Sequence, residues 1–317
     1  MTIERNPGID LNLDWIESIQ VNKSAIERRA ASIGTRRSVK KQYQAAWLLK
    51  AITLIDLTTL AGDDTELRVK RLCAKAKKPV RHDLMTALGM GDMKMTTGAI
   101  CVYHDMLSTA AEELKGTDIH LAAVSTGFPA GLTPLHLKIE EIKESVKAGA
   151  DEIDIVITRK HVFAENWRAL YNEVKAYREA CGDAHMKTIL ATGEISTLRN
   201  VAKASMVCMM AGADFIKTST GKESVNATLP VSLTMIRQIR EYQERTGYKI
   251  GYKPAGGISK AKDALVYLSM MKEELGDDWL QPDLFRFGAS SLLGDIERQL
   301  EHHVTGHYSA AHRHAIG

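Results

Sequence analysis

The sequence predicts an α/β fold, a (β/α)8 TIM barrel with an N-terminal helical extension. Eight short runs of apolar and β-branched residues recur along the chain, and longer stretches of helical periodicity separate them. Most runs start about 30 residues after the previous one, which is the length of one βα unit. With 317 residues and 44% hydrophobic content, the chain has the size of one such barrel.

The predicted strands, in order, are residues 52–58, 99–103, 120–126, 152–157, 187–192, 214–219, 249–253 and 284–288. The stretch 137–148 illustrates the helices between them, because Ile139, Ile142 and Val146 form one apolar face and Gly149 supplies the stop. A doubly wound sheet also alternates strands and helices. Eight units without an early Gly-x-Gly-x-x-Gly turn favour the barrel.

Three parts are predicted along the chain. Residues 1–48 form the helical extension, residues 49–300 the catalytic barrel, and residues 301–317 a flexible polar tail. Three roles are open for the extension: a lid, an interface or a plug for the barrel bottom. We interpret its paired basic residues as a solvated helix face. The tail holds His302, His303 and His307, which we interpret as part of a mobile terminus rather than a metal site.

Charge and cysteine content exclude several classes of protein. Lysine plus arginine exceeds aspartate plus glutamate by only 42 − 39 = +3, so no nucleic-acid partner is expected. The four cysteines form no C-x-x-C pair, which fits a reducing cytoplasm. Acidic residues near the N-terminus argue against a targeting segment, and no apolar run is long enough to span a membrane.

Four charged residues lie near the downstream ends of predicted strands, where a barrel of this type carries its active site. They are Asp56, Asp154, Lys217 and Lys253. Residues alternate in direction along a strand, so in the fourth run the isoleucines can face the helices while Asp154 points into the barrel. The same alternation points Lys217 and Lys253 inward.

A buried lysine is a candidate nucleophile. At its ordinary pKa of about 10.4, a lysine is neutral in about one molecule in 2,500 at pH 7. Burial and a second cation would lower the pKa of Lys217, and Lys253 can be that cation. Asp154 would hold Lys253 and a water molecule as a proton relay. The alternative is that the three residues form a buried ion-pair network that fills the barrel.

Three glycine-containing loops follow the last three strands and look suited to an anion. They are residues 218–222, 254–259 and 288–291. Glycine lets backbone N–H groups approach a phosphate, and helix N-termini add favourable dipoles. Each loop can also be an ordinary tight turn.

No metal and no cofactor are expected, and no His-Glu-x-x-His pattern occurs. Cys101 is interpreted as part of the pocket wall.

With these residues in place, the chain resembles the deoxyribose-phosphate aldolases, metal-free Schiff-base aldolases of (β/α)8 fold. The resemblance covers about residues 45–295 and is closest to the longer, animal-type members. It rests on IDLTTL at 55–60, GADEID at 149–154, KTILATGE at 187–194, DFIKTSTGK at 214–222, VNAT at 225–228, KPAGG at 253–257 and FGASS at 287–291.

The resemblance implies a role for each matched residue. Lys217 is the Schiff-base lysine, Lys253 the second lysine that tunes it, and Asp154 the proton-relay carboxylate. The residues that line the pocket or hold the phosphate are Asp56, Cys101, Lys187, Thr218, Gly221, Lys222, Gly256, Gly257, Ser259, Gly288 and Ser290. At Ser259 the family commonly has arginine. His104 and Asp105 follow Tyr103 where proline is usual, and Tyr308 in the tail is given no role.

The implied activity is the reversible cleavage of 2-deoxy-D-ribose 5-phosphate to D-glyceraldehyde 3-phosphate and acetaldehyde, in deoxyribonucleoside catabolism. A homodimer without nucleic-acid or membrane partners is expected. The first alternative is another phosphosugar Schiff-base aldolase or a transaldolase. The second is a non-catalytic barrel whose extension or tail recruits RNA or a protein.

Overall fold

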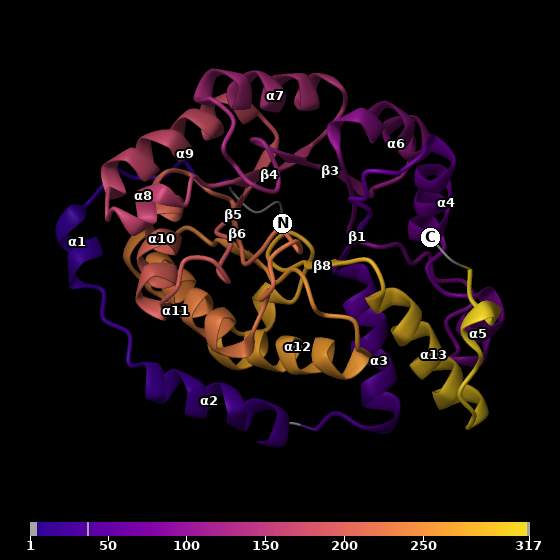
Figure 1. Cartoon of the computed structure of the whole chain (residues 1–317). Helices are drawn as coiled ribbons and strands as arrows, with labels where there is room; N and C mark the ends of the chain where they lie inside the picture. The colour runs from indigo at the N-terminus through magenta and orange to yellow at the C-terminus, as the bar shows by residue number, and fades with distance from the viewer. Residues whose placement is uncertain (1–4, 37, 316–317) are drawn as a thin grey trace.

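Eight parallel strands form a barrel in the computed structural model, which describes residues 5–36 and 38–315 (Figure 1). Seven strand pairs give the order β7-β6-β5-β4-β3-β2-β1-β8, and single bridges from Tyr252 to Phe285 and from Ala255 to Gly288 join β7 to β8. The strands are β1 (Ile55–Thr58), β2 (Ala99–Val102), β3 (His120–Ser125), β4 (Glu152–Val156), β5 (His185–Ile189), β6 (Phe215–Lys217), β7 (Gly251–Lys253) and β8 (Phe287–Ala289).

The predicted (β/α)8 barrel is confirmed, and each predicted run contains or overlaps a strand. The boundaries differ for local reasons. β1 starts later than predicted because the preceding helix continues to Thr53. β5 spans His185–Ile189 instead of residues 187–192, and Ala191 just beyond it has a φ of +56°, which does not fit an extended strand.

Helices connect the strands and cover the outside of the barrel. The stretch predicted as a helix over 137–148 is α7, and a positive φ of 104° at Gly149 follows its end. The helices are α4 (Glu66–Lys77), α5 (His82–Ala87), α6 (Leu107–Leu114), α7 (Leu135–Lys147), α8 (Lys160–Phe163), α9 (Trp167–Cys181), α10 (Leu198–Met210), α11 (Leu229–Thr246), α12 (Ala261–Leu275) and α13 (Leu292–Thr305).

The apolar core lies between the barrel and these helices. In β4, Ile153 and Ile155 belong to the core, whereas Glu152 and Asp154 make ionic contacts in the barrel interior. This alternation follows from the strand repeat of two, and it is the alternation that the sequence predicts. The apolar neighbours of each such charged residue pack against the helices, and the charged side chain between them therefore points into the barrel.

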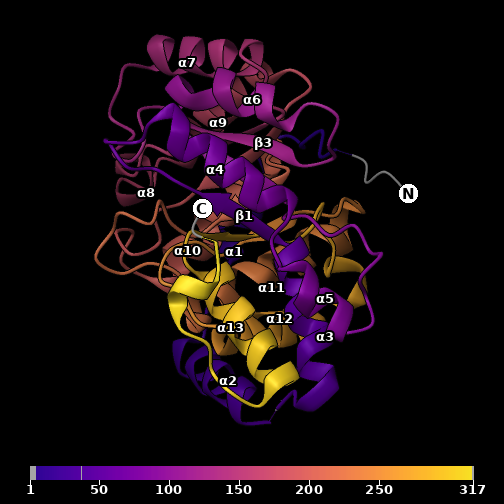
Figure 2. The same ribbon diagram turned by 90° about the vertical axis from the view of Figure 1, so that its right-hand side faces the viewer.

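The N-terminal extension forms three helices, α1 (Leu13–Ser18), α2 (Lys23–Arg36) and α3 (Lys41–Thr53), and α3 crosses the predicted boundary at residue 48. α1 packs on α10, α2 on α11 and α12, and α3 on α12 and α13. Figure 1 shows α1 and α2 along the outer surface, and Figure 2 shows α2 again at the lower edge of the molecule. Ion pairs help to hold them there: Arg29 contacts Glu273 at 2.6 Å and Glu274 at 3.3 Å.

The C-terminal segment continues the helical order past residue 300. The sequence predicts a polar tail from residue 301, whereas α13 runs to Thr305. Further on, His314 is buried, and its Nε2 atom lies 3.0 Å from Oε2 of Glu301. Within residues 5–36 and 38–315, no group of histidine, cysteine and acidic side chains is arranged to hold a metal ion. No described helix combines the length and the apolar character of a membrane span.

Candidate active site

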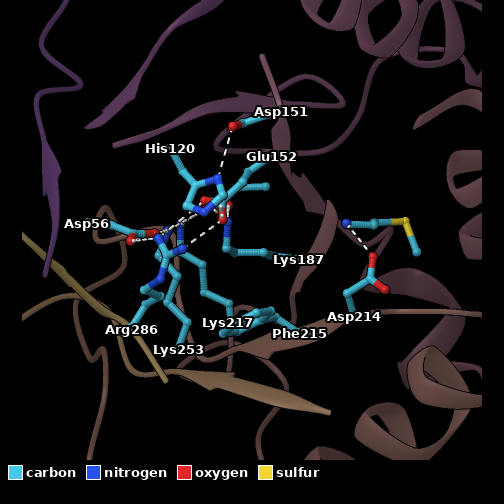
Figure 3. A network of polar contacts seen from close by, with 12 residues as sticks. Asp56, His120, Asp151, Glu152, Lys187, Asp214, Phe215, Lys217, Lys253 and Arg286 are labelled. Atoms are coloured by element: carbon cyan, nitrogen blue, oxygen red, sulfur yellow. Dashed lines mark hydrogen bonds and ion pairs between the residues drawn. The ribbon is translucent and has the colours of Figure 1, made fainter. Parts of the chain in front are cut away.

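Seven charged side chains fill the middle of the barrel (Figure 3). Each is at most 3% exposed, and they come from β1, β4, β5, β6, β7 and the residue before β8. They are Asp56, Glu152, Asp154, Lys187, Lys217, Lys253 and Arg286. Burying so many charges is tolerated only when each is paired, so the pairing determines what the site can do.

Two lysines share one carboxylate oxygen in the part of this cluster that lies toward the carboxyl ends of the strands, which we call its upper part. The Nζ atoms of Lys217 and Lys253 each lie 2.7 Å from Oδ2 of Asp154. Lys253 also forms an ion pair with Asp56. The other oxygen of Asp154, Oδ1, faces Lys187 at 3.7 Å and accepts no hydrogen bond from the described residues. The contact between Lys187 and Asp154 is thus the longest ion pair described for these residues.

Arg286 completes the lower part of the cluster. Its Nη1 atom lies 2.6 Å from Oδ1 of Asp56, and its Nη2 atom lies 2.9 Å from Oε1 of Glu152. Glu152 in turn pairs with Lys187. Six residues therefore form a closed loop in which carboxylates and cations alternate, and we refer to this loop as the charge ring. Its members in order are Asp154, Lys253, Asp56, Arg286, Glu152 and Lys187.

The charge ring is neutral, because it contains three carboxylates and three cations. Each ring cation contacts two ring carboxylates. Lys217 is the fourth cation of the cluster, giving 4 − 3 = +1 in total. Within the described part of the chain it contacts one carboxylate, that of Asp154, which it shares with Lys253. Lys217 is therefore the cluster's cation that can lose its proton with the least loss of pairing.

The pairing is reflected in the acid–base properties of the ring. Burial by itself would raise the pKa of Asp154, but Lys217 and Lys253 outweigh it and hold the pKa well below the ordinary carboxyl range. Burial would lower the pKa of Lys253, but Asp154 and Asp56 reverse the effect and raise it well above the ordinary lysine range. Lys253 is thus a fixed cation beside Lys217.

A cavity of about 460 Å³ opens above Lys217 at the carboxyl ends of the strands. The three glycine-containing loops that the sequence singles out all reach it. Seven of the predicted binding residues line it together with Lys217: Gly221, Lys222, Gly256, Gly257, Gly288, Ser259 and Ser290. The pocket has a buried lysine amine at its base and glycine-containing loops around it. It is suited to a small molecule that has a carbonyl at one end and a phosphate at the other.

Close approach explains two of the glycines. A Cβ atom on Gly288 would lie 2.8 Å from Cβ of Ala255 and 3.3 Å from Cε of Lys253. Gly256 has a φ of +79°, and a Cβ there would lie 2.6 Å from the side chain of Asn226. Across the cavity mouth, Nζ of Lys222 donates to the carbonyl of Leu60 at 2.8 Å.

Four predicted binding residues lie outside the walls of this cavity. Asp56 and Lys187 are ring members below it. Thr218 is buried and joins β6 to the loop after β7, because its Oγ1 atom accepts from the N–H of Ala255 at 3.0 Å. Cys101 is buried beside Ala122 and Val124, and burial raises the pKa of its thiol to about 11. It is thus protonated at neutral pH.

Sequence reasoning missed Glu152 and Arg286 as members of the site. Glu152 was detectable, since it stands two residues before Asp154 in the same strand and points the same way. Arg286 precedes β8, and no local pattern shows that it reaches residues 230 and 134 positions away. The positions of Lys217 and Lys253 along the chain also did not reveal that one oxygen of Asp154 lies between their amines.

A second hollow, of about 530 Å³, lies on the outer surface between α3, α5 and the loop after α5. Its walls are mostly apolar and include Leu49, Leu88, Met90 and Met95. None of the charge-ring residues reaches it. Lys50 also lines this hollow, and burial lowers the pKa of its amine, but none of the three glycine-containing loops reaches it.

Comparison with known proteins matches this chain to one group of enzymes. Residues 50–296 match the DeoC/LacD family of aldolases. Deoxyribose-phosphate aldolase of Homo sapiens is 60% identical over 309 residues, covering 97% of each chain. A putative deoxyribose-phosphate aldolase of Caenorhabditis elegans is 43% identical and covers 94% of this chain and 92% of its own. A solved structure of a putative deoxyribose-phosphate aldolase from Toxoplasma gondii ME49 shares the fold, with a TM-score of 0.71, 21% identity and coverage of 83% of this chain and 97% of its own.

Proposed function

This chain belongs to the DeoC/LacD family of aldolases, and we propose that it is the lyase that cleaves 2-deoxy-D-ribose 5-phosphate reversibly into D-glyceraldehyde 3-phosphate and acetaldehyde. The observation that carries this proposal is the position of Lys217. It is the cation of a buried cluster that has no carboxylate of its own, and it lines a cavity that glycine-containing loops surround. A carbonyl that enters the cavity meets an amine there.

The reaction begins at that amine. In its neutral form, Lys217 attacks C1 of the open-chain sugar; with uptake of one proton the adduct expels water, which gives an iminium ion. A base then takes the proton of the C3 hydroxyl, the C2–C3 bond breaks, and its electron pair moves into the iminium to form an enamine. Glyceraldehyde 3-phosphate leaves. Protonation of the enamine at C2 and hydrolysis of the resulting imine release acetaldehyde and restore Lys217.

Asp154 is assigned the proton transfers, with Lys253 as the fixed cation beside it. Asp154 contacts both lysine amines through one oxygen, and its other oxygen accepts no hydrogen bond from the described residues. That second oxygen is available to a water molecule beside the reacting carbons, which supports the predicted relay of carboxylate, water and ammonium. Lys253 remains protonated throughout, because it is held between Asp56 and Asp154.

The loops after β6, β7 and β8 are assigned the phosphate. Their glycines bring backbone N–H groups to the cavity wall, and α13 begins directly after Ser291. Ser259 on the wall carries no charge, so Lys222 is the lysine at the rim that supplies the positive charge. Lys222 would exchange its contact with Leu60 for the phosphate.

The wider setting of the enzyme is proposed on less direct grounds. The four cysteines are free and buried, as suits a reducing compartment such as the cytoplasm. The substrate places the enzyme in deoxyribonucleoside catabolism. That the chain forms a homodimer stays a prediction, as does the division into extension, barrel and tail.

Trapping of the imine tests the proposed function. The protein is incubated with acetaldehyde and sodium borohydride in the presence of EDTA, and the modified lysine is located by peptide mass analysis. A two-carbon adduct on Lys217 is expected, because the neutral amine condenses with the aldehyde and the hydride fixes the imine. An adduct spread over surface lysines, or none, would return Lys217 to a structural role. Cleavage of 2-deoxy-D-ribose 5-phosphate then identifies the second product and excludes other phosphosugar aldolases.

Replacing Lys222 with methionine should weaken binding of the phosphorylated sugar selectively. We expect KM for 2-deoxy-D-ribose 5-phosphate to rise about ten- to hundredfold, the cost of one charge-assisted hydrogen bond, with a much smaller change in kcat. KM for unphosphorylated 2-deoxy-D-ribose should stay the same. Lys222→Arg serves as the control, because it keeps the charge. Equal losses on both sugars would show that Lys222 shapes the loop and does not bind phosphate.

A further inference from the structure

The closed charge ring connects the reacting amine to residues that lie outside the substrate cavity. Asp154 contacts Lys217 directly, whereas Glu152 and Arg286 occupy the opposite side of the ring. Neither Glu152 nor Arg286 lines the cavity. Both are at most 1% exposed, so water screens their charges poorly. A change of charge at either residue is therefore felt by the other members of the ring.

The sign of that influence is set by the charge count. In the intact cluster the ring is neutral, and Lys217 is the excess positive charge. Loss of a ring carboxylate would give the ring a net charge of +1, which disfavours the ammonium form of Lys217. Loss of a ring cation would give the ring a net charge of −1, which favours the ammonium form.

We propose that Glu152 and Arg286 are positioning residues that decide, through the ring, at which pH Lys217 loses its proton and becomes a nucleophile. The inference rests on the proposed role of Lys217 as the imine-forming lysine. It assigns a function to two residues that do not touch the substrate. Because the ring is neutral, it adds no net negative charge that would favour the ammonium form of Lys217.

Other charged groups also face this cluster. Cys101 on β2 approaches Lys253 and Asp154, and burial raises its pKa to about 11, so it is neutral over the working range. His120 on β3 lies 4.0 Å from Glu152 and 2.9 Å from Asp151. The hydrogen bond to Asp151 raises the pKa of His120. Its titration must be separated from that of Lys217, whereas Asp56, Lys187 and Lys253 are ring members with their own pairs.

The test is the pH dependence of acetaldehyde trapping at Lys217, with cyanoborohydride as the reductant and the Lys217 peptide as the readout. In Glu152→Gln the midpoint of the trapping rate should move to lower pH by about one unit, which is about a tenfold faster rate below the midpoint. In Arg286→Gln it should move to higher pH by a similar amount. In the double variant the ring is neutral again, and the midpoint should return toward that of wild type.

Matched controls separate charge from structure. Arg286→Lys and Glu152→Asp keep the charges and should keep the wild-type midpoint. Glu297→Gln removes a buried carboxylate that pairs with Lys75 at 2.7 Å between α4 and α13, and it should leave the midpoint unchanged. Repeating the series with His120→Gln removes the titration of that imidazole. His185 on β5 also interacts with Glu152 and Lys187, and burial lowers its pKa, so a His185→Gln series is compared as well. If Arg286→Gln does not fold, the comparison of Glu152→Gln with Glu152→Asp decides alone.

The outcomes are distinct. Opposite shifts in the two single variants establish the electrostatic role. Unchanged midpoints, or shifts in the same direction, overturn it, even if both variants melt at lower temperature. Absence of any wild-type adduct on Lys217 would instead overturn the proposed function itself.

Discussion

Replacement of Lys217 with methionine should abolish aldol cleavage and yet leave the fold as stable as before. We expect kcat to fall about 10⁴-fold or more, because the reaction loses its electron sink when no imine can form. The melting temperature should stay the same or rise, because the substitution removes the excess cation of the cluster. Asp154 keeps Lys253 and Lys187 as partners. Kinetics, borohydride trapping and thermal unfolding measure the three effects.

Lys253→Met is the matched control for this experiment. It removes a cation of the same size, but one that lies between two carboxylates, Asp56 and Asp154. We expect it to lower the free energy of unfolding by about 3–5 kcal/mol, the usual cost of breaking a buried ion pair. If Lys217→Met destabilised the protein as much as Lys253→Met, Lys217 would be a structural member of the network and the charge count would be wrong.

Replacement of Asp154 with asparagine should lower both stability and activity. Asp154 is fully buried and faces Lys217, Lys253 and Lys187. Its loss changes the net charge of the cluster from +1 to +2, so we expect unfolding to become about 3–5 kcal/mol easier. Activity should fall as well, since the proton relay loses its carboxylate. Denaturant unfolding and single-turnover kinetics distinguish the two losses.

A double variant makes this prediction stricter. Asp154→Asn combined with Lys217→Met returns the cluster to +1, because one carboxylate and one cation are removed together. Part of the lost stability should therefore be recovered, although activity stays absent. A double variant that is less stable than Asp154→Asn alone would show that packing at Asp154, and not its charge, is what stabilises the barrel.

Much of the fold could be predicted because its signals are local. The eight runs of apolar residues are confirmed as strands, and the alternation of Ile153 and Ile155 with Asp154 placed the carboxylate inside the barrel. The strand ends were predicted less well. α3 continues to Thr53, into the first predicted strand, and the positive φ of Ala191 does not fit the end of the fifth predicted strand. These boundaries depend on neighbouring elements that a single run does not contain.

The candidate site was predictable to the extent that its residues carry charge in apolar surroundings. Lys217, Lys253 and Asp154 stand out for that reason, and the glycine loops stand out because glycine fits a close approach. Glu152 and Arg286 did not stand out. A glutamate at the start of a strand and an arginine before one are common on surfaces, and their burial becomes visible only in the folded barrel.

By itself, the sequence determined that this protein is a (β/α)8 barrel with inward-pointing lysines and a carboxylate at the ends of its strands. Strand alternation fixes the direction of each side chain within its own segment. The tertiary structure alone decided which charges meet. The ring closes through contacts such as Asp56 with Arg286, 230 residues apart. Such contacts depend on the tilt and register of the closed barrel, so they determine which lysine is left without a carboxylate of its own.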